Sequence, residues 1–408
     1  MSNAVFNTKR NTVAEKLFLI LRKYLDGKNV QIDEYIQADI QKLIYLCKIH
    51  GLQPILYRLI IQGREKWFGL SEEQTKNMKE QYITDTYRSL QQEISADEME
   101  VSFSGNQVPL VFFKGILIRN FYRDPQFRTM GDIDCVIPKE KRNLAHILML
   151  DMGYTCELDK GNTWVYSRGS VSVEMHTSIV NNTFRNVDCR AFFADALEHT
   201  EKLGKYTVLT REYHFCFLIY HIAKHLYSTG AGIRMFLDIA VLLKYYSYEF
   251  DWNMVQSFLN ELKLSKVAGA VFQLCRKWFE IEVLWPDQIN QEALEQLEEY
   301  VLAGGIFGFA THDVGDVYLR RGYEKNTGKH RYYFWLIWNY LFPTAENMMQ
   351  IMPCVETRKW LLPVAWVKRL WVGVFRRREH SLNTLKSMLK NDKGRGKTEY
   401  QMLKELGL

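Results

Sequence analysis

The chain has 408 residues, of which 47% are hydrophobic and only 8 are proline, so its length and composition fit two or three packed units. The formal net charge of +6 suits an acidic ligand such as a nucleotide, but it is lower than a dedicated nucleic-acid binder needs. The seven cysteines are scattered without a Cys-x-x-Cys pair, which argues against a disulfide framework or zinc ribbon and favours a reducing cytoplasm.

The first residues, MSNAVFNTKRNTVAEK, include no apolar stretch that could act as a signal peptide. No apolar run approaches the roughly 18 residues that a membrane span needs. We therefore expect a protein of the cytoplasm without a transmembrane segment.

A helical pattern runs from Thr12 to about Met99, with apolar residues three and four positions apart. Gly51 is placed to end one of these helices, and Ser71 is placed to cap the start of a longer one. The pattern changes at Gln107, where a short continuous apolar run begins.

The segment after Gln107 alternates between the two kinds of secondary structure. We expect strands at 108–113 and 132–138, helices at 114–122 and 141–154, and a β-hairpin from 163–169 and 172–179. This order of elements is typical of an α/β or α+β fold.

Beyond Asp188 the pattern is helical to the end of the chain. The clearest helices are expected at 210–228, 232–247, 252–264, 266–280 and 290–303. Residues 311–330 predict a loop, in which His312, Asp313 and Asp316 form a polar cluster.

Asp132 and Asp134 lie two residues apart on a predicted strand, so both carboxylates leave the same face. Two such carboxylates repel each other unless they share a proton or bind a cation. Mg²⁺ fits because it prefers oxygen ligands and leaves positions open for phosphates. The simpler alternative is a solvated strand end.

Glu174 lies on the second strand of the predicted hairpin, where alternation puts His176 on the same face. If that strand pairs beside 132–138, Glu174 becomes a third acid. It could then complete a two-metal site with ions roughly 4 Å apart, or act as a general base. An outward-facing glutamate without function is the alternative.

Lys114 and Gly115 lie at the predicted turn from strand to helix. A glycine there lets a phosphate approach backbone N–H groups at a helix N-terminus. Lys114 and Arg128 could add charge-assisted contacts to a triphosphate, or they could be ordinary surface cations.

The segments FFKGILIRNFYRDPQFRTMGDIDCVIP and VSVEMHTSI resemble the uncharacterised bacterial nucleotidyltransferases (NTP_transf_5) of the polymerase-β superfamily. The resemblance implies that three acids are catalytic and hold Mg²⁺ or Mn²⁺, namely Asp132, Asp134 and Glu174. It implies that five further residues bind the nucleotide, namely Lys114, Gly115, Arg128, Gly131 and His176. The usual turn of the superfamily is Gly-Ser or Gly-Gly, so Lys114 could replace a hydroxyl contact to the phosphates.

The resemblance continues through HIAKHLYSTGAGIRMFLDIAVLL and implies four residues of a nucleotide or acceptor pocket, namely His221, His225, Arg234 and Asp238. Simpler explanations exist for each pair. The two histidines, with His214, could form a polar seam where their helix meets the sheet. Arg234 and Asp238 are four residues apart, so they could form an intrahelical ion pair.

We therefore expect a mostly helical α+β fold with an N-terminal helical region (1–105), a small mixed-sheet nucleotidyltransferase core (106–190) and a C-terminal helical region (191–408) that could select the acceptor. The resemblance implies transfer of a nucleoside monophosphate from an NTP, such as ATP, to a hydroxyl-bearing small molecule or protein, with release of pyrophosphate. One alternative is a non-catalytic nucleotide-binding scaffold. Another is a membrane-surface adaptor acting through the aromatic and basic segment 360–379.

Overall fold

The computed structural model describes residues 10–30, 39–180, 187–228, 230–246, 248–305 and 393–408, and, between 338 and 375, all but 339, 344, 349–351, 356 and 357. The chain divides into two compact units, Met1–Lys224 with Gly232–Ile289, and His225–Ala231 with Asn290–Leu408. The predicted loop at 311–330, with His312, Asp313 and Asp316, lies outside the described residues.

The N-terminal region is helical as predicted, although its last helix ends at Gly105 and not at about Met99. The helices are α1 (Arg10–Leu25), α3 (Ile40–His50), α4 (Gln53–Leu56), which runs into a π-helix at Tyr57–Ile61, and the long α5 (Glu72–Gly105). Gly51 ends α3 in the left-handed conformation at φ 66°, which costs a glycine little. Ser71 and Gln74 form a capping box at the start of α5.

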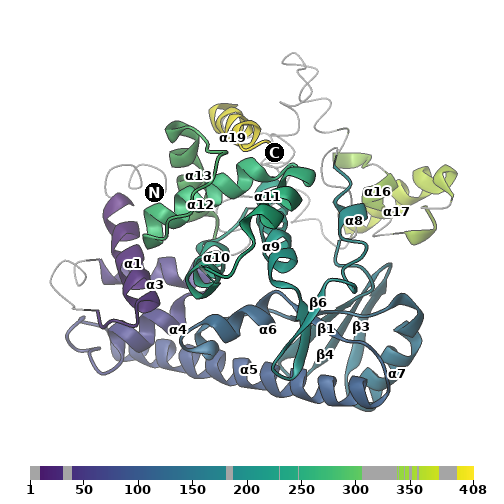
Figure 1. Cartoon of the computed structure of the whole chain (residues 1–408), viewed down its shortest axis with the longest axis horizontal. Coiled ribbons are helices and arrows are strands. Elements are labelled where there is room, and N and C mark those ends of the chain that lie inside the picture. The colour runs from purple at the N-terminus through teal and green to yellow at the C-terminus, as the bar shows by residue number, and fades with distance from the viewer. Residues whose placement is uncertain are drawn as a thin grey trace. The chain divides into compact units, whose positions relative to one another are not determined.

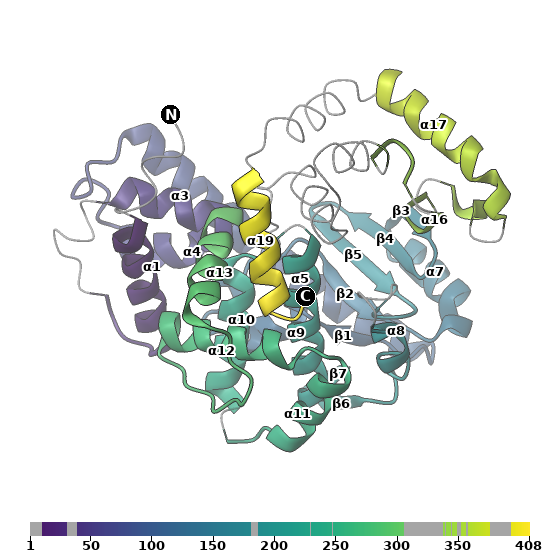
Figure 2. The ribbon, with the colours of Figure 1, turned by 90° about the horizontal axis from the view of Figure 1, so that it is seen from above.

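The first unit contains a mixed seven-stranded sheet of order β3-β4-β5-β2-β1-β7-β6. The strands are β1 (Val111–Phe113), β2 (Ile133–Val136), β3 (Thr155–Lys160), β4 (Thr163–Arg168), β5 (Val171–His176), β6 (Thr200–Leu203) and β7 (Tyr206–Leu209). Strand β2 pairs in parallel with β5, and β1 in parallel with β7, whereas the other neighbours are antiparallel. Figure 2 shows β5, β2 and β1 side by side.

The prediction that the chain beyond Asp188 is helical throughout is wrong at β6 and β7. Gly204, at φ 58°, makes a tight turn between these two strands. Tyr206 and Val208 alternate into the hydrophobic core of the sheet. A four-residue strand on each side of a Gly-Lys turn is a short signal, and the strong helical pattern after Thr210 hides it.

Short helices connect the strands and long ones cover the sheet. The remaining helices of the first unit are α6 (Gly115–Ile118), α7 (Arg142–Asp151), α8 (Cys189–Phe192), α9 (Arg211–Ser228, of which 225–228 belong to the second unit), α10 (Ile233–Tyr246), α11 (Trp252–Glu261) and α12 (Ser265–Phe279). Single 3₁₀ turns lie at Arg119–Phe121, Pro125–Phe127 and Lys139–Lys141. The predicted helix 114–122 is therefore one α-helical turn followed by a 3₁₀ turn.

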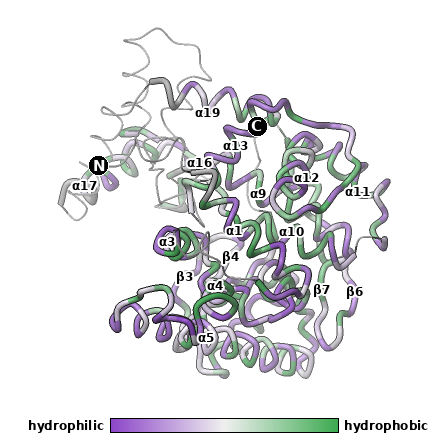
Figure 3. Tube along the Cα trace, turned by 90° about the vertical axis from the view of Figure 1, so that its left-hand side faces the viewer, coloured by the Kyte–Doolittle hydropathy of each residue, from purple (hydrophilic) through white to green (hydrophobic). Residues whose placement is uncertain are grey.

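The sheet lies between α5 and α9 (Figure 1). Met99 and Phe103 of α5 belong to the same buried cluster as Val173 of β5, so α5 covers that face. On the other face, Phe217 of α9 packs edge-on against Phe113 of β1, with ring centroids 5.4 Å apart. Helix α10 is buried along most of its length and is hydrophobic there in Figure 3.

The second unit is helical in its described part. It contains α13 (Gln291–Gly304), α16 (Ala345–Met348), α17 (Leu362–Phe375) and α19 (Lys393–Glu405), with 3₁₀ turns at Pro353–Val355 and Lys359–Leu361. Helix α13 packs against α19, and α16 against α17. No helix in the described part of the chain has the length and apolar character to cross a lipid bilayer. The fold as a whole is α+β and mostly helical, as predicted.

Candidate active site

The two aspartates of the Asp-x-Asp motif lie at the start of β2. Asp134 is inside the strand and only 4% exposed, whereas Asp132 is the residue directly before the first residue of the strand. Ile133 and Cys135 alternate with them and belong to the hydrophobic core cluster. The strand therefore holds one face in the core and turns its two carboxylates away from it.

Strand β5 brings the third acid to the same place. In the parallel pairing of β2 with β5, Glu174 lies directly opposite Asp134, and His176 lies opposite Val136. One side-chain atom each of Asp134, Glu174 and His176 can lie within 4.8 Å of the others, a grouping that could hold a metal ion. The condition that the sequence left open, a hairpin strand beside 132–138, is met.

The metal-ligand grouping differs from the predicted one by a single residue. It contains His176 in place of Asp132. Asp132 is nevertheless close, because its negative charge contributes, after burial, to the raised pKa of Glu174. His176 Nδ1 lies 3.1 Å from the Thr163 hydroxyl, which orients the ring with Nε2 toward Asp134 at 3.4 Å.

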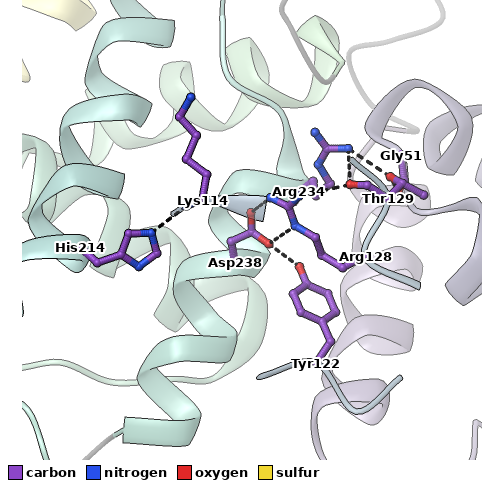
Figure 4. A network of polar contacts seen from close by, with 8 residues as sticks. All are labelled: Gly51, Lys114, Tyr122, Arg128, Thr129, His214, Arg234 and Asp238. Atoms are coloured by element: carbon purple, nitrogen blue, oxygen red, sulfur yellow. Dashed lines mark hydrogen bonds and ion pairs between the residues drawn. The ribbon is translucent and has the colours of Figure 1, made fainter. Parts of the chain in front are cut away.

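Lys114 reaches into this acid cluster, by which we mean Asp132, Asp134 and Glu174. Its Nζ donates a hydrogen bond of 2.6 Å to Asp134 Oδ1. Its backbone has φ 56° and ψ −128°, a conformation that favours glycine. The Lys114 N–H donates to His214 Nε2 at 3.0 Å, as Figure 4 shows.

The charges of the cluster shift one another's pKa values. Burial, together with Asp134, raises the pKa of Asp132. Burial, with Asp132 and Asp134, raises the pKa of Glu174 to about 7. Burial alone would raise the pKa of Asp134 too, but Lys114 and His176 bring it below its usual value. The cluster thus holds more negative charge than its one bonded lysine neutralises.

His214 supports the lysine from α9. Burial lowers the pKa of His214 to about 3, so the ring is neutral near pH 7 and Nε2 can accept the Lys114 N–H. The predicted polar seam between this helix and the sheet is therefore present at His214. His221 stacks on Phe217 with centroids 6.1 Å apart, and His225 belongs to the second unit, so a pocket role for these two stays a prediction.

Gly115 and Gly131 differ in the space that a side chain would find there. A Cβ on Gly115 would lie 2.3 Å from Arg128 Nη1, so the guanidinium fills the space beside it. A Cβ on Gly131 would meet nothing within 4 Å. The backbone is therefore open to the approach of a ligand at Gly131, the residue directly before Asp132.

Arg128 and Asp238 form the centre of a buried arginine network, shown in Figure 4. Arg128 donates to both carboxylate oxygens of Asp238, at 3.2 Å and 2.7 Å, and the Tyr122 hydroxyl donates to the same carboxylate at 2.7 Å. Arg234 donates to Thr129, at 2.8 Å to the carbonyl and 3.0 Å to the hydroxyl. The intrahelical ion pair allowed by the spacing of Arg234 and Asp238 is wrong, because both have partners on the segment before β2.

Two contributions of this region were missed from the sequence. Lys224 of α9 lies close to the acid cluster, because the charges of Glu174 and Asp134 act on its pKa. Desolvation and, after it, the charge of Lys114 lower that pKa, and the two acids oppose the shift. The position of Lys224 between His221 and His225 in HIAKH was the sequence feature that could have indicated it. Tyr122 was also missed, since an aromatic after a helix carries no sign that its hydroxyl binds a distant aspartate.

Two other surfaces do not contain the acids. A hollow between β7, α9 and α10 has His214 in its wall, but none of the three acids lines it. The aromatic and basic segment 360–379 forms α17 in its described part, with Trp360 and Trp371 more than half exposed. Neither surface brings together groups with evident chemistry, so the acid cluster is the candidate active site.

A mixed sheet thus brings three acids together at two adjacent parallel strands. The family model NTP_transf_5, described as "Uncharacterised nucleotidyltransferase", matches residues 37–280, and the chain belongs to this family. The protein is therefore a transferase that acts on nucleotidyl groups.

Two solved structures of the antibiotic-resistance factor ANT(2'')-Ia are similar to part of the chain. A solution structure is 12% identical, with 44% of this chain and 95% of that chain covered at a TM-score of 0.34. A crystal structure in complex with adenylyl-2''-tobramycin is 14% identical, with 42% and 98% covered at a TM-score of 0.32. No curated protein matches the chain.

Proposed function

We propose that the protein transfers a nucleoside monophosphate from an NTP to a hydroxyl of a small molecule or protein and releases pyrophosphate. The observation that carries this proposal is the register of β2 with β5, which puts Glu174 opposite Asp134 and beside Asp132. Asp132 and Glu174 have raised pKa values, lie at two central strands of the sheet and are partly exposed, and such acids are typical of a site that binds a cation and a substrate.

The donor set fits a divalent metal. Asp132, Asp134 and Glu174 offer the oxygen ligands that Mg²⁺ prefers, and His176 adds a nitrogen that Mn²⁺ accepts more readily. A metal held there would neutralise charge on the phosphates during in-line displacement at the α-phosphorus. We propose Mg²⁺ or Mn²⁺ as the cofactor.

Glu174 is proposed as the group that accepts the proton of the acceptor hydroxyl. Its side chain is 36% exposed, so an acceptor can reach it, and a pKa of about 7 suits proton transfer near neutral pH. The new bond joins the acceptor oxygen to the α-phosphorus. The bond from that phosphorus to the bridging oxygen breaks, and pyrophosphate leaves with the electron pair.

The nucleotide is proposed to lie over Gly131, where backbone is open to approach, with Lys114, Gly115, Arg128 and His176 around it. The helix that starts at Gly115 has only 4 residues, so its dipole contributes little to binding phosphate. Cationic side chains must therefore supply more of the attraction that binds the phosphates. Lys224 is a further candidate because it lies in the field of the acids.

The remaining predicted pocket residues are proposed to act from α9 and α10. Among the described residues, Arg234 Nε is buried without a hydrogen-bond partner, and burial together with the positive charge of Arg128 lowers the pKa of Arg234 to about 10. This surplus of positive charge favours a nearby polyanion. His221 and His225 are proposed to line the nucleotide or acceptor pocket.

The test is an assay of transfer from labelled ATP, GTP, CTP and UTP to pools of small molecules and to host proteins, with pyrophosphate release measured in parallel. Asp132→Asn and Asp134→Asn should abolish transfer, while Asp151→Asn, a change at an exposed aspartate on α7, should leave it intact. Saturable NTP binding without turnover in any pool would favour the nucleotide-binding scaffold instead.

A further inference from the structure

One oxygen of the acid cluster already has a cation of the chain's own. Lys114 Nζ lies 2.6 Å from Asp134 Oδ1, and the two side chains are 20% and 6% exposed. His176 Nε2 faces the same oxygen at 3.4 Å. Oδ1 of Asp134 is therefore shared between an ammonium and an imidazole.

The backbone holds Lys114 in this position at a cost. A residue with a side chain is strained at φ 56° and ψ −128°, and a glycine would avoid this strain. The Lys114 N–H is fixed by His214 Nε2 at 3.0 Å, and on the next residue Arg128 fills the space beside Gly115. A lysine that only served solubility would need none of these restraints.

We propose that the Lys114 ammonium takes the place of one metal ion, so that the active site works with a single divalent cation. This inference rests on the proposed function. One ammonium and one divalent ion together balance the three carboxylates of the acid cluster, and with Oδ1 bonded to the ammonium only the second oxygen of Asp134 stays open to a metal ion.

The arrangement gives each acid a separate task. Asp134 holds the ammonium with Oδ1 and keeps its second oxygen, with Asp132, for the divalent ion. Glu174 keeps its role as proton acceptor because no second ion has to be held by it. Lys114 is thus a positioning residue that fixes the charge and orientation of Asp134.

The experiment counts Mn²⁺ ions by electron paramagnetic resonance, in the full chain with the nonreactive analogue α,β-methylene-ATP. Two Mn²⁺ ions roughly 4 Å apart show spin coupling, and a single ion does not. Wild type should bind one ion without coupling. Lys114→Gly removes the ammonium and also relieves the backbone strain, so it should fold, bind two ions and show coupling.

Two control variants separate charge from position. Lys114→Arg keeps a cation beside Asp134 and should remain at one ion. Lys139→Met removes an exposed positive charge that has no part in the proposed site and should also remain at one ion. A coupled pair of ions in wild type, or one ion in Lys114→Gly, would overturn the inference. If wild type binds no Mn²⁺ saturably, or if Asp134→Asn leaves that binding unchanged, the proposed function is overturned, and this inference with it.

Discussion

The acid cluster and the arginine network lie close together, but their charges differ in how far the fold pairs them. In the network, Arg128 and Asp238 are 8% and 7% exposed and bond each other in two places. In the cluster, the Glu174 side chain is 36% exposed, and partial burial together with the neighbouring acids raises its pKa. Charges that the fold pairs internally hold the structure, whereas charges that it leaves repelling one another are available to a ligand.

The sharpest way to test this difference is Asp132→Asn, for which activity and stability should move in opposite directions. Transfer should fall about 10³-fold, which is about 4 kcal/mol of barrier, since the metal loses a charged ligand. The melting temperature should rise, because the raised pKa of Asp132 means that the fold disfavours its charge. Pyrophosphate release and calorimetry measure the two effects.

Asp151→Asn is the matched control, with neither effect expected. A lower melting temperature for Asp132→Asn would contradict the view that this acid is held against the preference of the fold. Unchanged transfer would contradict its role as a ligand.

The second prediction concerns the other region. Asp238→Asn removes the carboxylate that pairs with the buried Arg128 guanidinium and should cost about 3 kcal/mol of unfolding free energy. Urea unfolding measures this cost. Arg128→Met combined with Asp238→Asn should cost less than the sum of the two single changes, because they share one ion pair. Strict additivity would show that the pair contributes nothing to stability.

The sequence could predict the cluster better than the network, and the reason is the range of the contacts. Asp132 and Asp134 follow from alternation along one strand, and Glu174 follows from alternation along another. Asp238 bonds Tyr122 and Arg128, which lie 116 and 110 residues away. Its local partner, Arg234, is four residues along the helix, so the local rule gave the wrong pair.

The backbone at Lys114 could not be predicted for a related reason. A lysine before a glycine gives no sign that the lysine, and not the glycine, has the positive φ. That conformation depends on His214, 100 residues along the chain, and on Asp134. The helical regions were easier, since periodicity and caps act within a few residues.

The third prediction uses pH to test how His214 holds Lys114. Because the folded pKa of about 3 lies below the unfolded value of 6.5, this contribution to stability is present above pH 6.5 and is lost as the pH falls toward 3. Between pH 6.5 and 5 the loss should approach about 2 kcal/mol. His214→Gln keeps an acceptor without this titration, so the difference between wild type and variant isolates it from the acids. Parallel stability curves over this range would exclude a neutral, buried ring at His214.

The smallest effects should come from two glycines. Gly115 lies beside Arg128 of the arginine network, and Gly131 directly precedes Asp132 of the acid cluster. Gly115→Ala puts a Cβ 2.3 Å from Arg128 Nη1 and should cost at least about 1 kcal/mol of unfolding free energy, since the network must move. Gly131→Ala meets nothing within 4 Å and should change stability by less than about 0.5 kcal/mol. If phosphates approach the backbone there, the same methyl group should still weaken NTP binding several-fold in isothermal titration. An unchanged Kd for Gly131→Ala would move the nucleotide away from this residue and toward Lys224, while leaving the acid cluster as the metal site.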